Sequence, residues 1–408
     1  MSSQRELSFE NTEHAFAYKT NQELKKARFL FSTMGYASLV KLGTRITPWA
    51  MRVGLPIKGL IRSTIFKQFV GGETLSKTKW VADRLDKFNV RVILDYGVEG
   101  KDGEDNFDHA CEEFIKVIKY AGTQSNIPFM SIKVTGFARF GLLEKLDLAA
   151  KEKSGYEGIV HTEVLIPAEF EEWRRVVTRM NRIIEAAVSA GVGVLVDAEE
   201  SWVQDPVDAL TMMMMQQYNH MRPVVYNTIQ LYRHDRLKFL HRTVEIANSK
   251  NFIPAVKLVR GAYMEKERRR AAENNYDSPI QPDKQSCDRD YNLAVEYCIK
   301  NYQSLGVIIA SHNEKSNLFT AELMDKLMIA HTHPHIHFSQ LYGMSDNITF
   351  NLAKAGFSVS KYLPFGPIND VIPYLMRRAQ ENSSVSGQTG RELGLIKKEL
   401  ERRQSKNV

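Results

Sequence analysis

Two adjacent arginines near the end of the chain have the spacing of a binding face. Tyr374, Arg377, Arg378 and Glu381 stand at i, i+3, i+4 and i+7 in the stretch YLPFGPINDVIPYLMRRAQEN. A helix would place them on one face and the apolar residues of the stretch on the other. Paired guanidinium groups suit a carboxylate or a phosphate, which they can bind bidentately. The alternative partner is water, because charged helix faces are commonly solvated.

The segments before this helix predict a barrel. From about residue 88 onward, short β-branched apolar runs alternate with longer helical patterns. Eight runs are predicted strands: 90–97, 129–137, 193–200, 224–233, 253–263, 306–313, 336–344 and 358–366. This alternation predicts an α/β fold, a (βα)8 TIM-type barrel with the last helix above the barrel mouth. An open doubly wound sheet is the alternative, but no Gly-x-Gly-x-x-Gly follows any strand and no Walker A loop occurs.

Polar residues interrupt the apolar runs close to most of the predicted strand ends. Barrel enzymes carry their active residues at the C-terminal ends of strands, and buried charge is costly unless it is paired or used. The residues concerned are Lys133, Asp197, Glu199, Glu200, Gln230, Lys257, Arg260, Ser311, His312, Asn313, Tyr342 and Tyr362. We therefore predict an active site at the barrel mouth, with the two arginines turned toward it.

The composition is that of an ordinary folded chain. Three widely spaced cysteines and the absence of CxxC argue against a disulfide scaffold or a cysteine zinc site. No apolar run is long enough to span a bilayer, and the polar N-terminus lacks the order of a secretory signal. Four histidines alternate between His331 and His337, but Pro334 interrupts them on the stability side of the barrel, so no metal site is predicted.

The formal charge of +7 is concentrated near the N-terminus. Residues 24–72 contain nine Lys or Arg and no Asp or Glu, whereas the remainder carries 46 basic and 48 acidic residues. This basic, partly apolar segment predicts either a helical cap with lysines facing water or a peripheral anchor on an anionic membrane. No zinc-finger or RNA-binding motif supports nucleic acid as a partner.

Five motifs in order resemble the proline dehydrogenase family: DAEE, KLVRGAY, SHN, YLPFG and PYLMRRAQEN. The likeness is greatest to its monofunctional, eukaryote-like branch. It implies FAD as cofactor, oxidation of L-proline to Δ1-pyrroline-5-carboxylate as the first step of proline catabolism, and a membrane quinone as electron acceptor. It also implies a peripheral location at the inner membrane, on the cytoplasmic side in a bacterium or in the mitochondrion of a eukaryote.

The resemblance assigns roles residue by residue. Substrate binding falls on Lys133, Leu341, Tyr362, Tyr374, Arg377 and Arg378, and catalytic roles fall on Lys133, Asp197 and Lys257. The cofactor set is Ala198, Gln230, Lys257, Val259, Gly261, Ala262, Lys284, His312, Asn313, Arg378 and Glu381. Glu99 matches a gating carboxylate. The group that deprotonates the amine stays open between Lys133, Asp197 and water.

Two positions depart from the pattern of the bacterial bifunctional relatives. Lys257 stands where they carry an arginine near the flavin N5, and Met264 where they carry a tryptophan near the adenine. Tyr362 favours proline over hydroxyproline, because hydroxyproline-oxidising relatives are expected to carry a smaller residue there. The alternative function is a barrel hydrolase using Asp197 with Glu199 and Glu200, although adjacent strand residues point to opposite faces.

The predicted domain organisation has three parts. Residues 1–87 form a basic, mostly helical segment, residues 88–382 form the flavin- and substrate-binding barrel, and residues 383–408 form a helical tail. The mixed charge of the tail predicts a solvated helix end.

Overall fold

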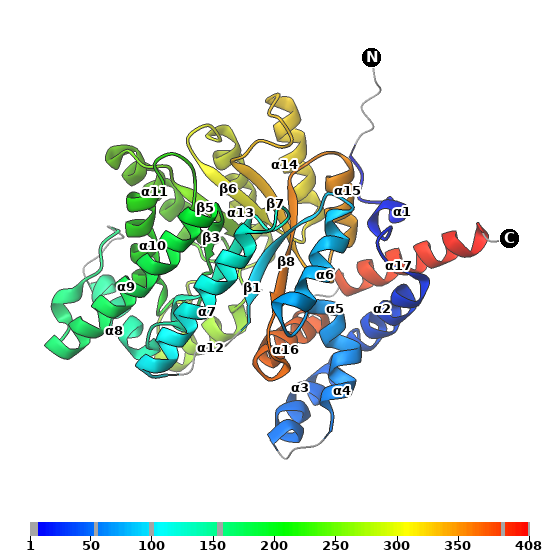
Figure 1. Cartoon of the computed structure of the whole chain (residues 1–408), viewed down its shortest axis with the longest axis horizontal. Coiled ribbons are helices and arrows are strands. Elements are labelled where there is room, and N and C mark those ends of the chain that lie inside the picture. The colour runs from blue at the N-terminus through cyan, green and yellow to red at the C-terminus, as the bar shows by residue number, and fades with distance from the viewer. Residues whose placement is uncertain (1–6, 53–55, 98–101, 153–157, 385–387, 407–408) are drawn as a thin grey trace. The chain divides into compact units, whose positions relative to one another are not determined.

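The computed structural model describes residues 7–52, 56–97, 102–152, 158–384 and 388–406. Eight parallel strands close into a barrel in chain order (Figure 1). They are β1 Arg91–Tyr96, β2 Phe129–Ile132, β3 Gly193–Val196, β4 Val225–Gln230, β5 Ala255–Val259, β6 Gly306–Ala310, β7 Ile336–Leu341 and β8 Val359–Phe365. Each of the eight predicted strands is present, although all are shorter than predicted, and the open-sheet alternative is wrong.

Helices follow the strands in the order that the sequence pattern predicts. They are α7 Glu104–Gly122, α8 Phe140–Glu152, α9 Pro167–Ala190, α10 Gln204–Tyr218, α11 Arg236–Lys250, α12 Met264–Asn274, α13 Lys284–Lys300, α14 Glu314–Lys326 and α15 Asp346–Lys354. Short 3-10 turns lie at Val134–Gly136 and Thr162–Val164. The longest of these helices, α9, has proline in its first turn and ends at Gly191 in the left-handed conformation, as helix-capping rules predict.

Helices also lie at both ends of the chain. The N-terminal ones are α1 Thr12–Ala15, α2 Asn21–Met34, α3 Ala37–Arg52, α4 Lys58–Ile61, a π-helical turn Arg62–Phe66, α5 Lys67–Phe69 and α6 Leu75–Asp86. The C-terminal ones are α16 Ile368–Ser384 and α17 Gln388–Ser405. None of the helices described has the length and apolar character needed to cross a membrane.

The chain divides into two compact units by its internal contacts. The first unit comprises residues 1–99 and 339–408, and the second unit comprises residues 100–338. In the first unit β1 pairs with β8, which sets Ile93 opposite Tyr362 and Tyr96 opposite Phe365. In the second unit β2 to β6 pair in succession, and Thr228 stands opposite Lys257.

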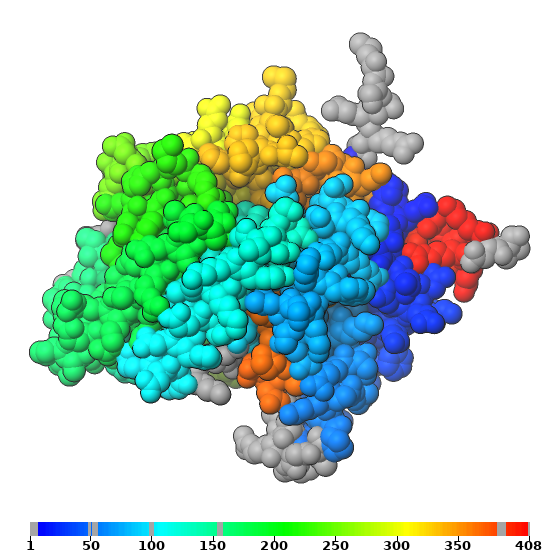
Figure 2. All heavy atoms as spheres, in the orientation of Figure 1, coloured from blue at the N-terminus to red at the C-terminus, as the bar shows by residue number. Residues whose placement is uncertain are grey.

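The core of the first unit joins segments from both ends of the chain. Phe31 of α2, Phe69 of α5, Leu375 of α16 and Leu395 of α17 belong to one buried apolar cluster. In Figure 1 α17 lies beside α2, and Figure 2 shows the blue N-terminal surface against the red C-terminal helix. Residues of the N-terminal helices therefore pack into this core, while lysines such as Lys25 and Lys26 are exposed.

The charged tail differs from its prediction. Glu399 of α17 is fully buried, and Arg402 and Arg403 both donate hydrogen bonds to it. Arg403 also donates to the carbonyl oxygens of Phe16 and Lys19 at 2.9 Å. The prediction of a solvated helix end is wrong on this face, because the charges are used to bind the N-terminal segment to α17.

Candidate active site

Helix α16 begins where β8 ends and is seated on the C-terminal ends of β1 and β8. The turn between them contains Gly366, with φ of +146°. Val371 of α16 packs so closely that a Cβ on Gly97 would lie 3.0 Å from its Cγ1. A side chain at Gly97 would push the helix away, so this close contact fixes the start of α16 at the strand ends.

The polar face of α16 is only partly exposed to solvent. Arg378 is only 8% exposed, and its Nη2 donates to Glu381 Oε1 at 2.6 Å. Its guanidinium also lies 5.3 Å from the ring centre of Tyr374. Burial raises the pKa of Glu381, against the lowering effect of the two arginines. The interpretation that water is the partner of this face is wrong for Arg378, which is held in place by protein groups.

Tyr374 adds a buried hydroxyl to the same face. Its oxygen has no hydrogen-bond partner within the part of the chain that is described, and burial raises its pKa. Asp95 of β1 acts electrostatically on it and is itself buried. Buried polar atoms are rarely left without a partner, so an unused phenol indicates a place for a ligand group. Sequence reasoning missed Asp95, although a charge interrupting the apolar run VILDY was an available signal.

The second unit contains a buried ion pair at its strand ends. Lys257 of β5 forms a salt bridge with Asp197, which directly follows β3. Ser131 of β2 donates to the same carboxylate oxygen at 2.6 Å. Burial would raise the pKa of Asp197, but Lys257 and Lys133 outweigh it and the pKa is lowered. Asp197 is therefore ionised at neutral pH, and its affinity for a proton is weak.

The pKa of Glu199 shifts in the opposite direction to that of Asp197. Burial raises the pKa of Glu199 to about 7, although Lys133 and the hydroxyl of Thr135 favour its ionised form. Thr135 Oγ1 donates to it at 2.7 Å. Glu200 instead forms an ion pair with Lys266 on α12. The two glutamates thus have different partners rather than forming one acid pair.

The residues assigned to the cofactor occupy the ends of β3 to β6. Gln230 is buried, donates to the carbonyl of Glu199 at 2.9 Å, and leaves its own Oε1 without a partner in the described chain. Gly261 has φ of +143°, and a Cβ there would meet the ring of Tyr232 at 2.4 Å. Ala198 and Val259 are half-buried, and Ala262 is exposed. Tyr232 therefore fills the space at Gly261, whereas the open amide oxygen of Gln230 is a feature that a hydrogen-bonding cofactor can use.

Other predicted cofactor residues lie at the N-terminal ends of α13 and α14. Lys284 is exposed and forms an ion pair with Asp288, which Arg260 also binds at 2.7 Å. Asn313 caps α14, accepting from the backbone N–H of Ser316, and His312 precedes it half-buried. Helix starts and cations suit a diphosphate, so the residues present fit FAD. Arg260 was not among the predicted cofactor residues.

The predicted site residues fall into two sets by unit. Leu341, Tyr362, Tyr374, Arg377, Arg378 and Glu381 belong to the first unit, in which Leu341 and Tyr374 both pack against the same apolar cluster. Lys133, Asp197, Lys257 and the other cofactor residues belong to the second unit. Glu99, the predicted gate, lies outside the described residues. Tyr342 lines a cavity among the N-terminal helices.

A family model for proline dehydrogenase matches residues 79–391. That span includes the eight strands and the arginine face of α16. The chain belongs to the proline dehydrogenase family. Members of this family are FAD-dependent, which agrees with the fit of the cofactor residues described above.

Individual proline dehydrogenase relatives differ in the activity that their names state. The chain is 32% identical to mitochondrial proline dehydrogenase 1 of Dictyostelium discoideum, over 85% of this chain and 66% of that protein. It is 31% identical to a hydroxyproline dehydrogenase of Xenopus laevis, over 95% and 88%. It is 35% identical to the carbapenem antibiotics biosynthesis protein CarD of Pectobacterium carotovorum, over 85% and 86%.

Solved structures share the fold of this proline dehydrogenase family member. Proline utilization A from Bdellovibrio bacteriovorus, inactivated by N-propargylglycine, superposes with a TM-score of 0.70 at 19% identity. The chain covers 40% of that protein, and 43% of the Bradyrhizobium japonicum homologue. The hydrolase alternative has no support from these comparisons, and the separate partners of Glu199 and Glu200 also argue against it.

Proposed function

We propose that this chain oxidises L-proline to Δ1-pyrroline-5-carboxylate with FAD as the hydride acceptor. The observation that carries the proposal is the buried guanidinium of Arg378 on α16, set beside Arg377 and the hydroxyl of Tyr374, which has no hydrogen-bond partner among the residues that the structure describes. The carboxylate of an amino acid is the natural ligand of such a face.

Different residues of the chain bind the substrate, pack against its ring and stabilise the developing charge. Arg377 and Arg378 bind the proline carboxylate, while Tyr362 and Leu341 pack against its ring. Lys257 supplies positive charge where negative charge develops, and Asp197 holds that ammonium in place. Bound FAD would accept a hydride from proline C5, and the groups of the chain would orient the ring for that transfer.

The amine must be neutral before hydride can leave. Asp197 has a lowered pKa and is already paired with Lys257 and Ser131, so it is a poor base. We propose Lys133 or water as the proton acceptor. Lys133 follows β2 directly, but its ammonium form is the one that favours the ionised carboxylates of Asp197 and Glu199, so Lys133 could accept a proton only after releasing its own.

Tyr362 supports our proposal for which of the two substrates in the relatives' names is preferred. It lies in the middle of β8, opposite Ile93 of β1, and is half-buried. A phenol ring at this position fills the space that a ring hydroxyl would need, so we propose proline rather than hydroxyproline as the preferred substrate.

Absorbance spectroscopy tests the proposed activity. Purified protein is expected to show flavin bands at about 380 and 450 nm, and anaerobic proline should bleach the longer-wavelength band. Hydroxyproline should bleach it at least about tenfold more slowly, the discrimination that a pocket lacking room for one extra group provides. A colourless protein, or a flavin that proline leaves oxidised, would contradict the proposal.

We further propose that a membrane quinone reoxidises the flavin and that α3 docks on the membrane. Leu39, Leu42 and Ile46 stand at i, i+3 and i+7 on α3, and all three are exposed, Leu42 by 55%. Lys41 and Arg45 are exposed next to them. An exposed apolar stripe beside cations is the composition of a helix that lies on an anionic bilayer.

Vesicle co-sedimentation tests the docking. A deletion of residues 1–72 would not be a clean test of docking by α3, because it would also remove Leu24 and Phe31 from the core of the first unit. Leu39→Asp with Ile46→Asp should instead reduce binding to phosphatidylglycerol vesicles by at least about tenfold, from the lost apolar burial. Leu148→Asp with Ile159→Asp is the matched control, since both residues are also exposed. Equal binding of the two variants to the vesicles would show that α3 does not contact the membrane.

A further inference from the structure

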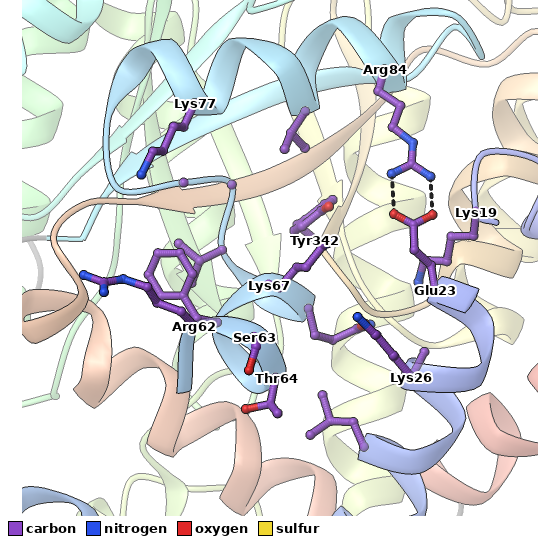
Figure 3. A pocket seen from close by; sticks show the side chains of 18 of the residues that line it. Lys19, Glu23, Lys26, Arg62, Ser63, Thr64, Lys67, Lys77, Arg84 and Tyr342 are labelled. Carbon is purple, nitrogen blue, oxygen red and sulfur yellow. Dashed lines mark hydrogen bonds and ion pairs between the residues drawn. The ribbon is translucent and has the colours of Figure 1, made fainter. Parts of the chain in front are cut away.

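The N-terminal helices of the first unit line a cavity of about 820 Å³ that is open to solvent on one side. Residues of α2, the π-helical turn, α5 and α6 line it, together with Tyr342 (Figure 3). Its volume is within the range of small-molecule sites, roughly 300–1,000 Å³. None of the residues predicted to bind proline or FAD lines this cavity.

The inner wall of the cavity is apolar. Ala27, Phe66 and Val70 line it and are almost completely buried. Phe29 and Trp80 also line it but are 71% and 62% exposed, which places large apolar side chains where the cavity meets solvent. Exposed aromatic side chains leading to a buried apolar wall favour a ligand with a hydrocarbon chain.

Positively charged residues outnumber negatively charged ones around the cavity. Seven Lys or Arg residues line it, against the two acids Glu23 and Glu73. Arg84 binds Glu23 (Figure 3), Arg62 binds Glu73, and Lys19 binds Asp346 at 2.9 Å. The remaining cations, Lys25, Lys26, Lys67 and Lys77, form no ion pair in the described parts of the chain. The lining is therefore cationic even after its internal pairs are counted.

We propose that this cavity binds a single-chain amphiphile with an anionic head group, of the fatty-acid class. The chain would lie against Phe66, Val70 and Ala27, and the carboxylate would lie among the unpaired lysines. A nucleotide or sugar phosphate would match the lysines but not the apolar wall, and a neutral chain would leave the lysines unused. Ligand binding in this cavity would not require the reaction at the barrel or membrane docking by α3.

Calorimetric titration with three ligands that share one chain tests the head-group preference. Dodecanoate is expected to bind at least about tenfold more tightly than dodecyltrimethylammonium or dodecanol, each kept below its micelle-forming concentration. Equal affinity for all three, or no binding of dodecanoate, would overturn the proposal.

Paired variants test whether the ligand binds in this cavity. Lys26→Glu with Lys67→Glu should weaken dodecanoate binding at least about tenfold. Lys315→Glu with Lys326→Glu makes the same change in net charge at exposed positions outside the cavity, and should leave binding unchanged. Equal weakening by the two pairs would show a general effect of charge and overturn the assignment.

Two further variants distinguish ligand binding in the cavity from ligand binding on α3. Thr64→Trp places a large side chain at a half-buried lining position and should abolish dodecanoate binding, with flavin content and melting temperature as checks on folding. Leu39→Asp with Ile46→Asp, outside the cavity, should retain it. Should the α3 variant lose dodecanoate while Thr64→Trp binds it normally, the ligand would belong to α3 and the proposal would fail.

Discussion

Arg378→Met is expected to raise the KM for proline at least about 100-fold while FAD remains bound. Removing one partner from a buried, hydrogen-bonded charge pair costs roughly 2–5 kcal/mol of binding free energy. Arg377→Met should act in the same direction, because the two guanidinium groups share one carboxylate. Steady-state kinetics and the flavin-to-protein absorbance ratio measure the two parts of this prediction.

The helix offers controls for a general loss of structure. Arg378→Lys keeps the charge without the planar fork, so an intermediate KM is expected. Gln380→Met changes an exposed residue of the same helix and should leave the KM unchanged. Wild-type kinetics in both methionine variants of the arginine pair would refute the proposed carboxylate site.

Lys257→Met is expected to lower both activity and stability. The substitution leaves the carboxylate of Asp197 buried without its main partner, which costs about 3–5 kcal/mol in the free energy of unfolding. Losing the positive charge should also lower kcat for proline by at least about 100-fold, the effect of removing one electrostatic stabilising group. Urea unfolding of the flavin-loaded protein and single-turnover flavin reduction measure the two effects separately.

A double variant distinguishes the electrostatic role of Lys257 from its structural one. Lys257→Met with Asp197→Asn should recover most of the lost stability, because no buried charge is then unpaired, but activity should stay low. Lys79→Met breaks an exposed ion pair with Asp83 and should change the free energy of unfolding by less than about 1 kcal/mol. Recovery of full activity in the double variant would contradict a catalytic role for Lys257.

Local patterns in the sequence were sufficient to predict the barrel and the face of α16. Most of the strands are rich in apolar, β-branched residues, and the amphipathic spacing of Tyr374, Arg377 and Arg378 specifies a helix face whatever surrounds it. The motifs that resemble the proline dehydrogenase family are local as well. These properties depend on residues close together in the chain, so they can be recognised without knowing which elements become neighbours.

The pairing of charges was decided only by tertiary structure. Lys257 and Asp197 are far apart in the sequence, and strand order and register bring them together. Lys361 of β8 is fully buried and lies 2.9 Å from Asp346, which also accepts a hydrogen bond from Tyr18 at 2.8 Å. Despite burial, Lys257 and Lys133 lower the pKa of Asp197, and Lys19 and Lys361 lower the pKa of Asp346. No spacing rule predicts such pairs, because partner identity depends on which strands and helices become adjacent.

The N-terminal segment likewise has some properties that the sequence predicts and others that only tertiary packing sets. Its basic and apolar composition predicted a helical cap or a membrane anchor, and the sequence determined that it would be helical and cationic. Tertiary packing decided that Leu24 and Phe31 face the core, that Leu39 and Ile46 face outward, and that a cationic cavity remains between the helices. An amphipathic pattern states which residues share a face, but only the folded neighbours determine whether that face meets protein, water or a ligand.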